Sequence, residues 1–368
     1  MNATRIALFT GAVAMVAAGG AQSAAHSVTP SIKFDLSGHL SIIYMNADDG
    51  NSTEHYIADN DASQTRLRVK GEGDIGGGLT AGGAIEFGIS ALSGSSTVSI
   101  TDRDGTLSGN GSGINLRNTY LFFSGDFGTL TIGNTEGAAD GTSEHDFSGT
   151  SVIAGYSASD IGANFQFQNN GTPATTAAGT PLTVARSFGI YDFENRHSVI
   201  RYVSPEFGGG MTAGVSYGHK EDADVIDMGF NGNFKLASGD IRVGVGYSEH
   251  DPTQAVPTND TQIAGSVAFK MPSGFNVNAR YDVREVGRDV ETYNIKVGYI
   301  TGPHSMFIGY GESSDRAQEG VDGSVLSLGY RYDVFTNMEL YAGYNNFSVD
   351  GIAADDIRII SAGSRLKF

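Results

Sequence analysis

The sequence predicts an all-β protein, a transmembrane antiparallel up-and-down β-barrel of about 16 strands. One short phrase, an apolar residue, a tiny residue and a tyrosine, recurs six times. The copies are Val215–Tyr217, Val245–Tyr247, Val297–Tyr299, Ile308–Tyr310, Leu328–Tyr330 and Ala342–Tyr344. Around each copy, apolar side chains occupy every second position, which places them on one face of a strand. Many such strands, in a chain without a long apolar helix, indicate a barrel that is apolar outside and wet inside.

The N-terminal segment predicts an export signal. Arg5 supplies the positive charge, and the apolar run Ile6–Ala18 is too short for a spanning helix, which needs about 20 residues. Small residues that offer cleavage sites follow at Ala21, Ser23, Ala24 and Ala25. The alternative is a buried N-terminal helix. We therefore expect residues 1–25 to be a signal peptide and residues 26–368 to form a single barrel domain.

Composition excludes several classes of function. The formal net charge of −18 argues against a nucleic-acid partner, because binding phosphate requires a basic surface. The absence of cysteine excludes disulfides, thiolate catalysis and zinc–thiolate sites. The 52 glycines, about twice the ordinary usage, alternate within strands or fill turns.

The first three strands are predicted at Ile32–Tyr44, Thr65–Gly73 and Leu79–Ala91. The apolar face of the first strand carries Phe34, Leu36, Leu40, Ile42 and Tyr44. The polar face of the second carries Arg66, Arg68 and Lys70, each of which would cost about 2–4 kcal/mol against lipid at mid-membrane. These bases are therefore expected to face the lumen. Ile241–Ser248 and Phe275–Arg284 repeat the alternation later in the chain.

Short and long connections alternate along the chain. The short ones are Gly73–Gly78, Gly125–Gly128, Ser204–Gly210, Ala237–Asp240, Met271–Gly274, Thr301–His304 and Val334–Asn337. The long ones include Asn46–Asp61, Ser93–Ser112, Glu249–Asp260 and Glu312–Asp322. Tight turns on one side and long loops on the other are typical of an outer-membrane barrel, whereas a soluble sandwich has no reason for this asymmetry.

Aromatic residues fall near both ends of the strands. Those expected near the outer rim are Tyr44, Tyr217, Tyr247, Tyr281, Tyr310 and Tyr344. Those expected near the inner rim are Phe269, Tyr299, Tyr330 and Tyr332. Two belts would bracket the apolar band, because amphipathic rings favour the headgroup level. Ordinary enrichment of tyrosine in strands explains the residue type but not its position at strand ends.

One stretch breaks the rhythm, between the expected strands Thr129–Asn134 and His197–Ser204. Asn164–Gln168 could be an extra hairpin, or the whole stretch could be one elaborated loop. We favour the loop, since an odd added strand would upset the even strand count.

Three segments carry a family resemblance. Ser124–Gly133 looks like a hairpin before a pore loop, His197–Pro205 looks like the strand after it, and Ile359–Phe368 ends on a terminal aromatic. Together they resemble the Gram-negative porin family of trimeric general-diffusion channels. Two features depart from the family pattern: Asn134 stands where Arg is frequent, and Pro205–Gly209, similar to a pore-loop motif, lies between two strands and is interpreted as a periplasmic turn.

The resemblance implies an exported outer-membrane protein of a Gram-negative bacterium, assembled as a homotrimer among lipids. It implies a passive channel for ions and small hydrophilic solutes. Phe368 would serve as the assembly signal, and the loop after the fifth strand would fold inward to narrow the lumen.

The loop at 134–195 holds seven acids and one base, Arg186. The candidate constriction acids are Glu136, Asp140, Glu144 and Asp146, and the remaining acids are Asp160, Asp192 and Glu194. The expected basic wall opposite is Arg66, Arg68, Lys70, Arg117 and Arg201. Facing carboxylates and guanidinium groups create a transverse field, and the excess of acid predicts weak cation selectivity. The alternative is a solvated surface loop.

Acidic residues also raise the question of calcium, which prefers oxygen ligands. One group, in the first long loop, is Asp48, Asp49, Glu54, Asp59 and Asp61, and another, in a second loop, is Glu221, Asp222, Asp224 and Asp227. No twelve-residue calcium loop is present, and divalent bridging of anionic lipids is an equal alternative. No other cofactor is expected.

Other functions remain open at this point. An outer-membrane enzyme would need a nucleophile and a base, and no catalytic motif is present; His145–Asp146 is the only suggestive pair, so the chain is expected not to be an enzyme. A plugged adhesin is a further alternative. A substrate-specific channel would need an aromatic track, for which the lumen offers few residues, such as Phe307 and Tyr341.

Overall fold

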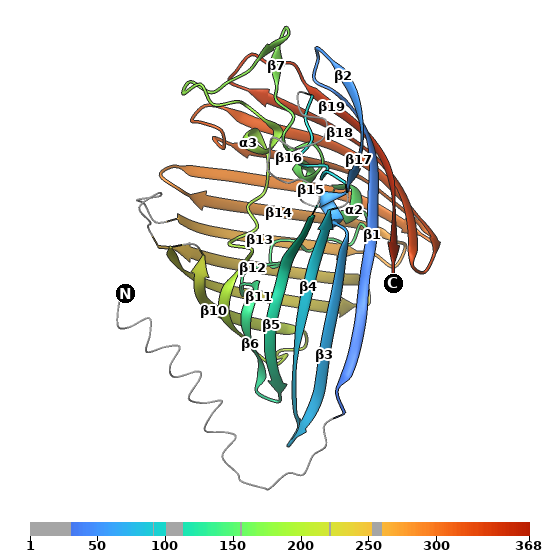
Figure 1. The fold of residues 1–368 in the computed structure, drawn as a ribbon, viewed down its shortest axis with the longest axis vertical. Helices are drawn as coiled ribbons and strands as arrows, with labels where there is room; N and C mark the ends of the chain where they lie inside the picture. Colours follow the sequence, from blue (N-terminus) through green and yellow to red (C-terminus); the bar gives the residue numbers. More distant parts are fainter. Residues whose placement is uncertain (1–30, 91, 101–112, 155–156, 221, 252–259) are drawn as a thin grey trace.

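The computed structural model describes residues 31–90, 92–100, 113–154, 157–220, 222–251 and 260–368. The predicted signal peptide and Glu221 lie outside the described residues. Within them, one sheet of 17 strands dominates the chain (Figure 1). Among the described residues, no helix is long and apolar enough to cross a membrane.

The sheet closes into an antiparallel barrel, as predicted. The first half of the wall comprises β1 (Lys33–Asp48), β2 (Thr53–Asp59), β3 (Arg66–Gly76), β4 (Leu79–Ser90), β5 (Gly113–Gly125), β6 (Gly128–Glu136), β9 (Arg196–Val203) and β10 (Met211–Lys220). The second half comprises β11 (Ala223–Leu236), β12 (Gly239–His250), β13 (Asp260–Lys270), β14 (Phe275–Glu285), β15 (Asp289–Thr301), β16 (His304–Ser314), β17 (Asp322–Phe335), β18 (Met338–Asp350) and β19 (Ile357–Lys367). In Figure 1, β1, β3, β4 and β5 lie in front of β11–β14.

Closure depends on β1, which pairs with the last strand on one side and with two strands on the other. Tyr44 lies opposite Ala362 of β19, and Leu36 lies opposite Val69 of β3. The upper half of β1 pairs with β2 on the same side as β3. β2 and β3 pair with successive parts of β1, so together they occupy one strand position in the wall. The 17 strands therefore fill 16 positions around the barrel.

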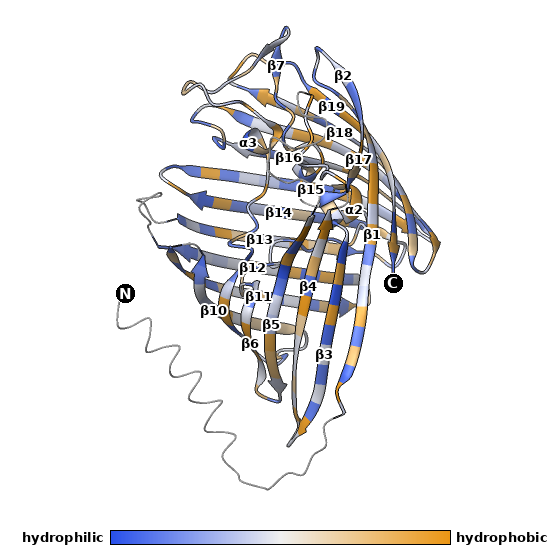
Figure 2. Cartoon of the chain, viewed as in Figure 1, coloured by the Kyte–Doolittle hydropathy of each residue, from blue (hydrophilic) through white to orange (hydrophobic). Residues whose placement is uncertain are grey.

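Hydropathy alternates along the strands (Figure 2). Most of the bulky apolar side chains of the wall are exposed on its outer face. On β1, Phe34 is 72% exposed and Leu36 is 64% exposed. Exposed tyrosines lie toward both strand ends, for example Tyr310 near one end of β16 and Tyr299 near the other end of β15. An exterior of this kind matches hydrocarbon flanked by headgroups.

The predicted asymmetry of the connections is only partly correct. The turns at 77–78, 126–127 and 336–337 are short, as expected, and 204–210 connects β9 and β10. At the opposite end, however, β10–β11 and β14–β15 are also joined by two or three residues.

The predicted long connection at Asn46–Asp61 is also different, since most of it belongs to β1 and β2. The chain can reverse tightly there because the Asp49 carboxylate accepts hydrogen bonds from the backbone N–H groups of Asn51 and Ser52.

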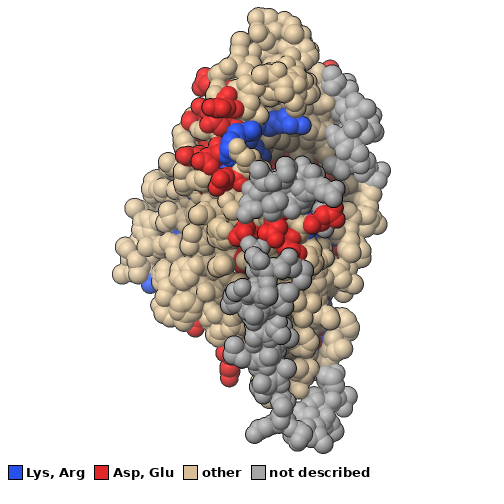
Figure 3. Space-filling view, turned by 90° about the vertical axis from the view of Figure 1, so that its left-hand side faces the viewer, with Lys and Arg blue, Asp and Glu red and all other residues tan. Residues whose placement is uncertain are grey.

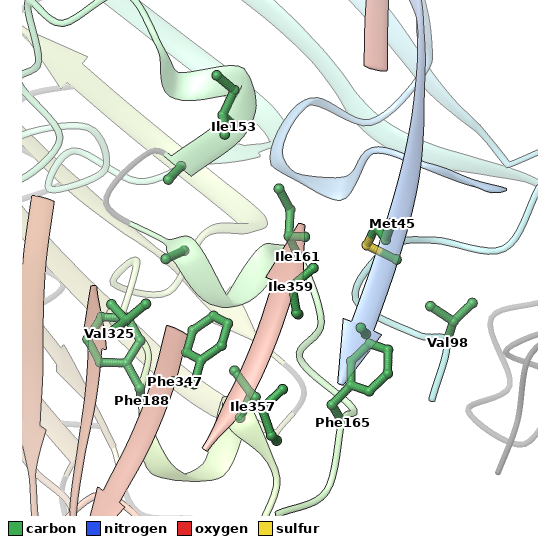
Figure 4. Packing of buried hydrophobic residues seen from close by; sticks show 14 of the residues in the cluster. Met45, Val98, Ile153, Ile161, Phe165, Phe188, Val325, Phe347, Ile357 and Ile359 are labelled. Atoms are coloured by element: carbon green, nitrogen blue, oxygen red, sulfur yellow. The ribbon is translucent and has the colours of Figure 1, made fainter. Parts of the chain in front are cut away.

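Part of the interior is apolar, which the alternation did not predict. Near the loop end of β1 and β19, Ile43, Met45, Ile357 and Ile359 point inward and are fully buried. They pack against the segment between β6 and β9, including Phe165 (Figure 4). This apolar cluster fills the lumen beside β1 and β17–β19.

Candidate functional site

Residues 137–195, here called the inner loop, lie inside the barrel between β6 and β9. Their backbone N–H groups donate to inward side chains of several strands: Ala138 to Ser216 of β10 at 2.8 Å, His145 to Ser266 of β13 at 3.1 Å, and Phe147 to Asn278 of β14 at 2.8 Å. The prediction of one inward-folded loop after the fifth strand position is therefore confirmed.

The described part of the inner loop contains only short elements. These are α2 (Ser151–Ala154), η3 (Ala158–Asp160), β7 (Gln168–Asn169), β8 (Thr172–Pro173) and α3 (Val184–Ser187). β7 and β8 pair only with each other, so they add no strand to the wall. A further turn, η1 (Asp61–Ser63), lies between β2 and β3.

Glycines in the wall let the inner loop approach the sheet. A Cβ at Gly229 of β11 would lie 1.9 Å from the carbonyl oxygen of Ala138, and one at Gly244 of β12 would lie 2.0 Å from that of Thr142. Only glycine leaves room for such close backbone contact. The high glycine content therefore has a specific structural use in this wall.

Lys296 of β15 anchors the middle of the inner loop. Its Nζ donates to Asp146 Oδ2 at 2.8 Å and to the Ala154 carbonyl oxygen at 2.5 Å, and it lies 4.6 Å from the Phe307 ring centre. The Asp146 side chain is only 9% exposed. Asp146 thus holds the loop against the wall, instead of facing the opening as predicted, because a buried ammonium group needs a counter-charge.

Three carboxyl groups gather on the inner loop: Asp140, Glu144 and Asp192. Glu144 is exposed, and the other two are partly buried. Burial, followed by the charges of Asp192 and Glu144, raises the pKa of Asp140 to about 9. Burial, followed by the charge of Glu144, raises the pKa of Asp192 to about 7. Asp192 and Asp140 therefore lose their protons between neutral and alkaline pH. The sequence places Asp192 in the loop but does not indicate that it joins the site, because only folding brings the two loop ends together.

Most bases of the predicted wall already have an acidic partner. Arg117 Nε lies 2.9 Å from Glu86 Oε1 of β4, and Arg66 Nη1 lies 3.7 Å from the same oxygen. Lys70 Nζ lies 2.7 Å from Glu72 Oε2. Sequence reasoning missed Glu86, which faces inward and is only 6% exposed.

The remaining bases of the predicted wall lie on β3 and β9. Arg68 donates to the Tyr120 hydroxyl at 2.6 Å. Arg201 Nη1 donates to the carbonyl oxygen of Glu136 at 2.9 Å, at the start of the inner loop. Arg201 therefore supports the loop backbone.

Glu136 ends β6 and forms an ion pair that the sequence did not indicate. Its Oε1 lies 3.5 Å from Arg196 Nη1, and Asn118 Nδ2 donates to the same oxygen at 3.3 Å. The Arg196 charge also acts on Asp140. Another missed group is Glu339 of β18, which pairs with Arg331, Arg365 and Lys367.

Several of the acidic groups considered for calcium are bound by other groups of the chain. Asp48 and Asp49 accept hydrogen bonds from their own turn, and Asp61 accepts two from Ser96. The prediction that Asp227 lies in a loop is wrong. Asp227 is buried on β11, and its Oδ2 lies 3.8 Å from His197 Nε2. Asp224, at the start of β11, pairs with His219. Their oxygens thus serve the chain itself.

Phe368 lies where the last residue meets β1. Its backbone N–H donates to the Gly38 carbonyl oxygen at 3.0 Å, and its own carbonyl oxygen accepts from Gly38 N at 2.9 Å. The ring is 53% exposed. The terminal aromatic therefore sits on the outer wall beside β1, where the barrel closes.

Charged side chains also gather at one end of the barrel. Figure 3 shows the face at the left of Figure 1, where β14 and β15 are joined. Asp and Glu side chains gather there around one group of Lys and Arg side chains. An acidic surface of this kind raises the local concentration of cations.

Comparison with known proteins gives a consistent result. A family model described as Gram-negative porin matches residues 10–352. Outer membrane porin protein 32 of Delftia acidovorans is 25% identical over 348 residues, covering 90% of this chain and 86% of that protein.

Two solved structures share the fold at low sequence identity. The Salmonella typhi OmpF complex with daunomycin has a TM-score of 0.62 and 15% identity, covering 91% of this chain and 98% of that one. The trimer form of Vibrio cholerae OmpT has a TM-score of 0.59 and 14% identity, covering 92% of this chain and 100% of that one.

Proposed function

The chain belongs to the Gram-negative porin family and resides in the outer membrane, and we propose that it forms a weakly cation-selective, water-filled channel for passive diffusion of ions and small hydrophilic solutes. The outward apolar face of the wall and the inward-folded loop support the proposal of a channel. The selectivity rests on the balance of charge at the inner loop.

That balance is the observation that carries the proposal. Arg66 and Arg117 share Glu86, and Arg331, Arg365 and Lys367 share Glu339. The cluster of Asp140, Glu144 and Asp192 has no comparable excess of base. Two guanidinium groups whose charges act on it, Arg196 and Arg280, are already paired with Glu136 and Asp282. Fixed negative charge in the lumen favours cations. The preference is weak at neutral pH because Asp140 keeps its proton there.

The test is the reversal potential of the protein in a planar bilayer under a potassium chloride gradient. We expect a potential of the sign that indicates preference for potassium. A potential that indicates preference for chloride would refute the proposed selectivity. The absence of stepwise currents would refute the channel itself and would favour a plugged barrel.

A general-diffusion channel is favoured over a substrate-specific one by the position of two aromatic residues. Phe307 and Tyr341 were the candidates for a lumen track, but they are 6% and 3% exposed and belong to the apolar cluster beneath the inner loop. They therefore pack against protein and are not available to a passing sugar. The fold and family are those of a channel, and we propose no enzymatic activity.

We also propose that the protein assembles as a homotrimer. A groove of about 550 Å³ lies on the outer face of β1 and β3–β6. Small residues form its floor, including Gly71, Ala81 and Gly83, and apolar side chains such as Phe34 and Leu121 form its sides. A second copy could seat bulky side chains there. Mass measurement in detergent should give three chains, and a stable monomer would contradict this assignment.

A further inference from the structure

Three side chains with metal-binding atoms meet where β12 ends and β13 begins, next to the last residues of the inner loop. His250 and Asp260 lie directly opposite one another in the register of the two strands. Glu194 approaches them from the inner loop. Their ligand atoms, one from each residue, all lie within 4.8 Å of one another.

His250 has a ring nitrogen that the described part of the chain leaves without a partner. Its Nε2 is buried and has no hydrogen-bond partner among the described residues. Glu194 and Asp260 are 8% and 7% exposed. A buried imidazole nitrogen that lacks a partner and lies beside two carboxylates calls for an explanation by a ligand or bound water.

Two bases hold the carboxylates in position. Lys220 Nζ donates to Glu194 Oε2 at 3.2 Å, and Arg284 donates through two nitrogens to the two oxygens of Asp260. Carboxylates that bind metals are commonly held by such outer hydrogen bonds, and each oxygen keeps a further lone pair. The bases also reduce the negative charge of the site, so the affinity for a dication will be moderate. The Lys220 side chain is 38% exposed and can turn toward water when a cation arrives.

We propose that Glu194, His250 and Asp260 bind a divalent transition-metal ion of the zinc type. One imidazole nitrogen and two carboxylate oxygens suit Zn²⁺, whereas Ca²⁺ and Mg²⁺ prefer sites made of oxygen alone. Water would complete the coordination. The ion would lie close to the carboxyl cluster, since Glu194 is two residues from Asp192. Its two positive charges would therefore reduce the preference of the channel for cations.

The experiment is a calorimetric titration of the folded, full barrel in detergent with zinc chloride. We expect one zinc ion per chain. The His250→Ala variant should bind at least about tenfold more weakly. A matched control is His219→Ala, which removes a 62% exposed histidine paired with Asp224 and belonging to no three-ligand group among the described residues. This control should bind zinc as the unaltered protein does.

A second variant separates loss of a ligand from loss of fold. His250→Gln keeps a side chain of similar size, and the heat-dependent mobility of the barrel on a gel reports whether each variant is folded. Folded His250→Gln should also lose zinc affinity. The proposal is overturned if the unaltered protein binds no zinc, if a folded His250 variant binds it equally well, or if His219→Ala loses binding to the same degree. None of these results depends on conductance, so the channel assignment is tested separately.

Discussion

Replacing Lys296 with methionine should release the middle of the inner loop from the wall. The substitution keeps the length of the side chain but removes the ammonium group that donates to Asp146, Ser148 and Ala154. The Asp146 carboxylate then remains buried without its cation. Breaking a buried ion pair by removing one partner costs about 3–5 kcal/mol. The strand ladders on both sides of β15 remain, so this cost falls mainly on the attachment of the loop.

The measurement is amide hydrogen exchange of residues 146–154, followed by mass spectrometry. A loss of about 3–5 kcal/mol corresponds to exchange roughly 100- to 4,000-fold faster in this segment, if local opening controls exchange. Open-channel current should become noisier as the loop moves. Adding Asp146→Asn should recover most of the protection, because the uncompensated charge is removed.

Lys70→Met is the matched control. Lys70 also pairs with an acid, Glu72, at 2.7 Å, but both side chains are more than a third exposed. An exposed pair contributes about 0–1 kcal/mol, so exchange of residues 146–154 should change little. Unchanged protection and unchanged noise in Lys296→Met would refute the anchoring role of Lys296.

Three further predictions concern charge and packing in the lumen. Cation preference should rise between about pH 7 and pH 9, as Asp192 and Asp140 lose their protons; reversal potentials measured across this range check it, and an equal rise in Asp140→Asn would contradict the assignment to Asp140. Glu86→Gln should weaken cation preference by leaving Arg66 and Arg117 without their shared acid, and a shift toward potassium would show that these bases do not face the conducting path. Gly229→Ala should destabilise the attachment of the inner loop by about 1–3 kcal/mol, because the added Cβ meets the Ala138 carbonyl oxygen. Gly73→Ala, whose nearest neighbour would lie at an ordinary 3.6 Å, is its control, and equal hydrogen exchange in the two variants would count against the close-approach argument.

The sequence was sufficient to predict the wall and the place of the inner loop. The alternation of apolar residues predicts the outward face directly, because the surface that contacts lipid must be apolar. It could not predict that Ile43 and Ile359 point inward, since adjacent apolar pairs such as Ile42–Ile43 and Ile359–Ile360 satisfy both faces at once. The alternation assigns a face but does not say whether that face meets water or the inner loop.

The charge pattern of the site was harder to predict. Lys296 and Asp146 are 150 positions apart in the sequence, and their contact depends on how the loop crosses β15. The acidic residues around Asp227 favour a loop, yet β11 begins at Ala223 and places Asp227 in the wall. Asp192 reaches Asp140 only because both ends of the inner loop return to the same side of the barrel. Contacts of this kind follow from the three-dimensional path of the loop and leave no local pattern.

In the proposed channel, water fills the space beside the inner loop while lipid meets the outside of the wall. Because the chain contains no cysteine, single cysteines at Glu144 and Leu121 can be tested separately with a charged, water-soluble thiol reagent during bilayer recording. Glu144 is the exposed member of the carboxyl cluster, and Leu121 is 62% exposed on the outer face. We expect the reagent to change the current through Glu144→Cys and to leave Leu121→Cys unaffected. The opposite pattern, or no response at Glu144→Cys, would contradict the account.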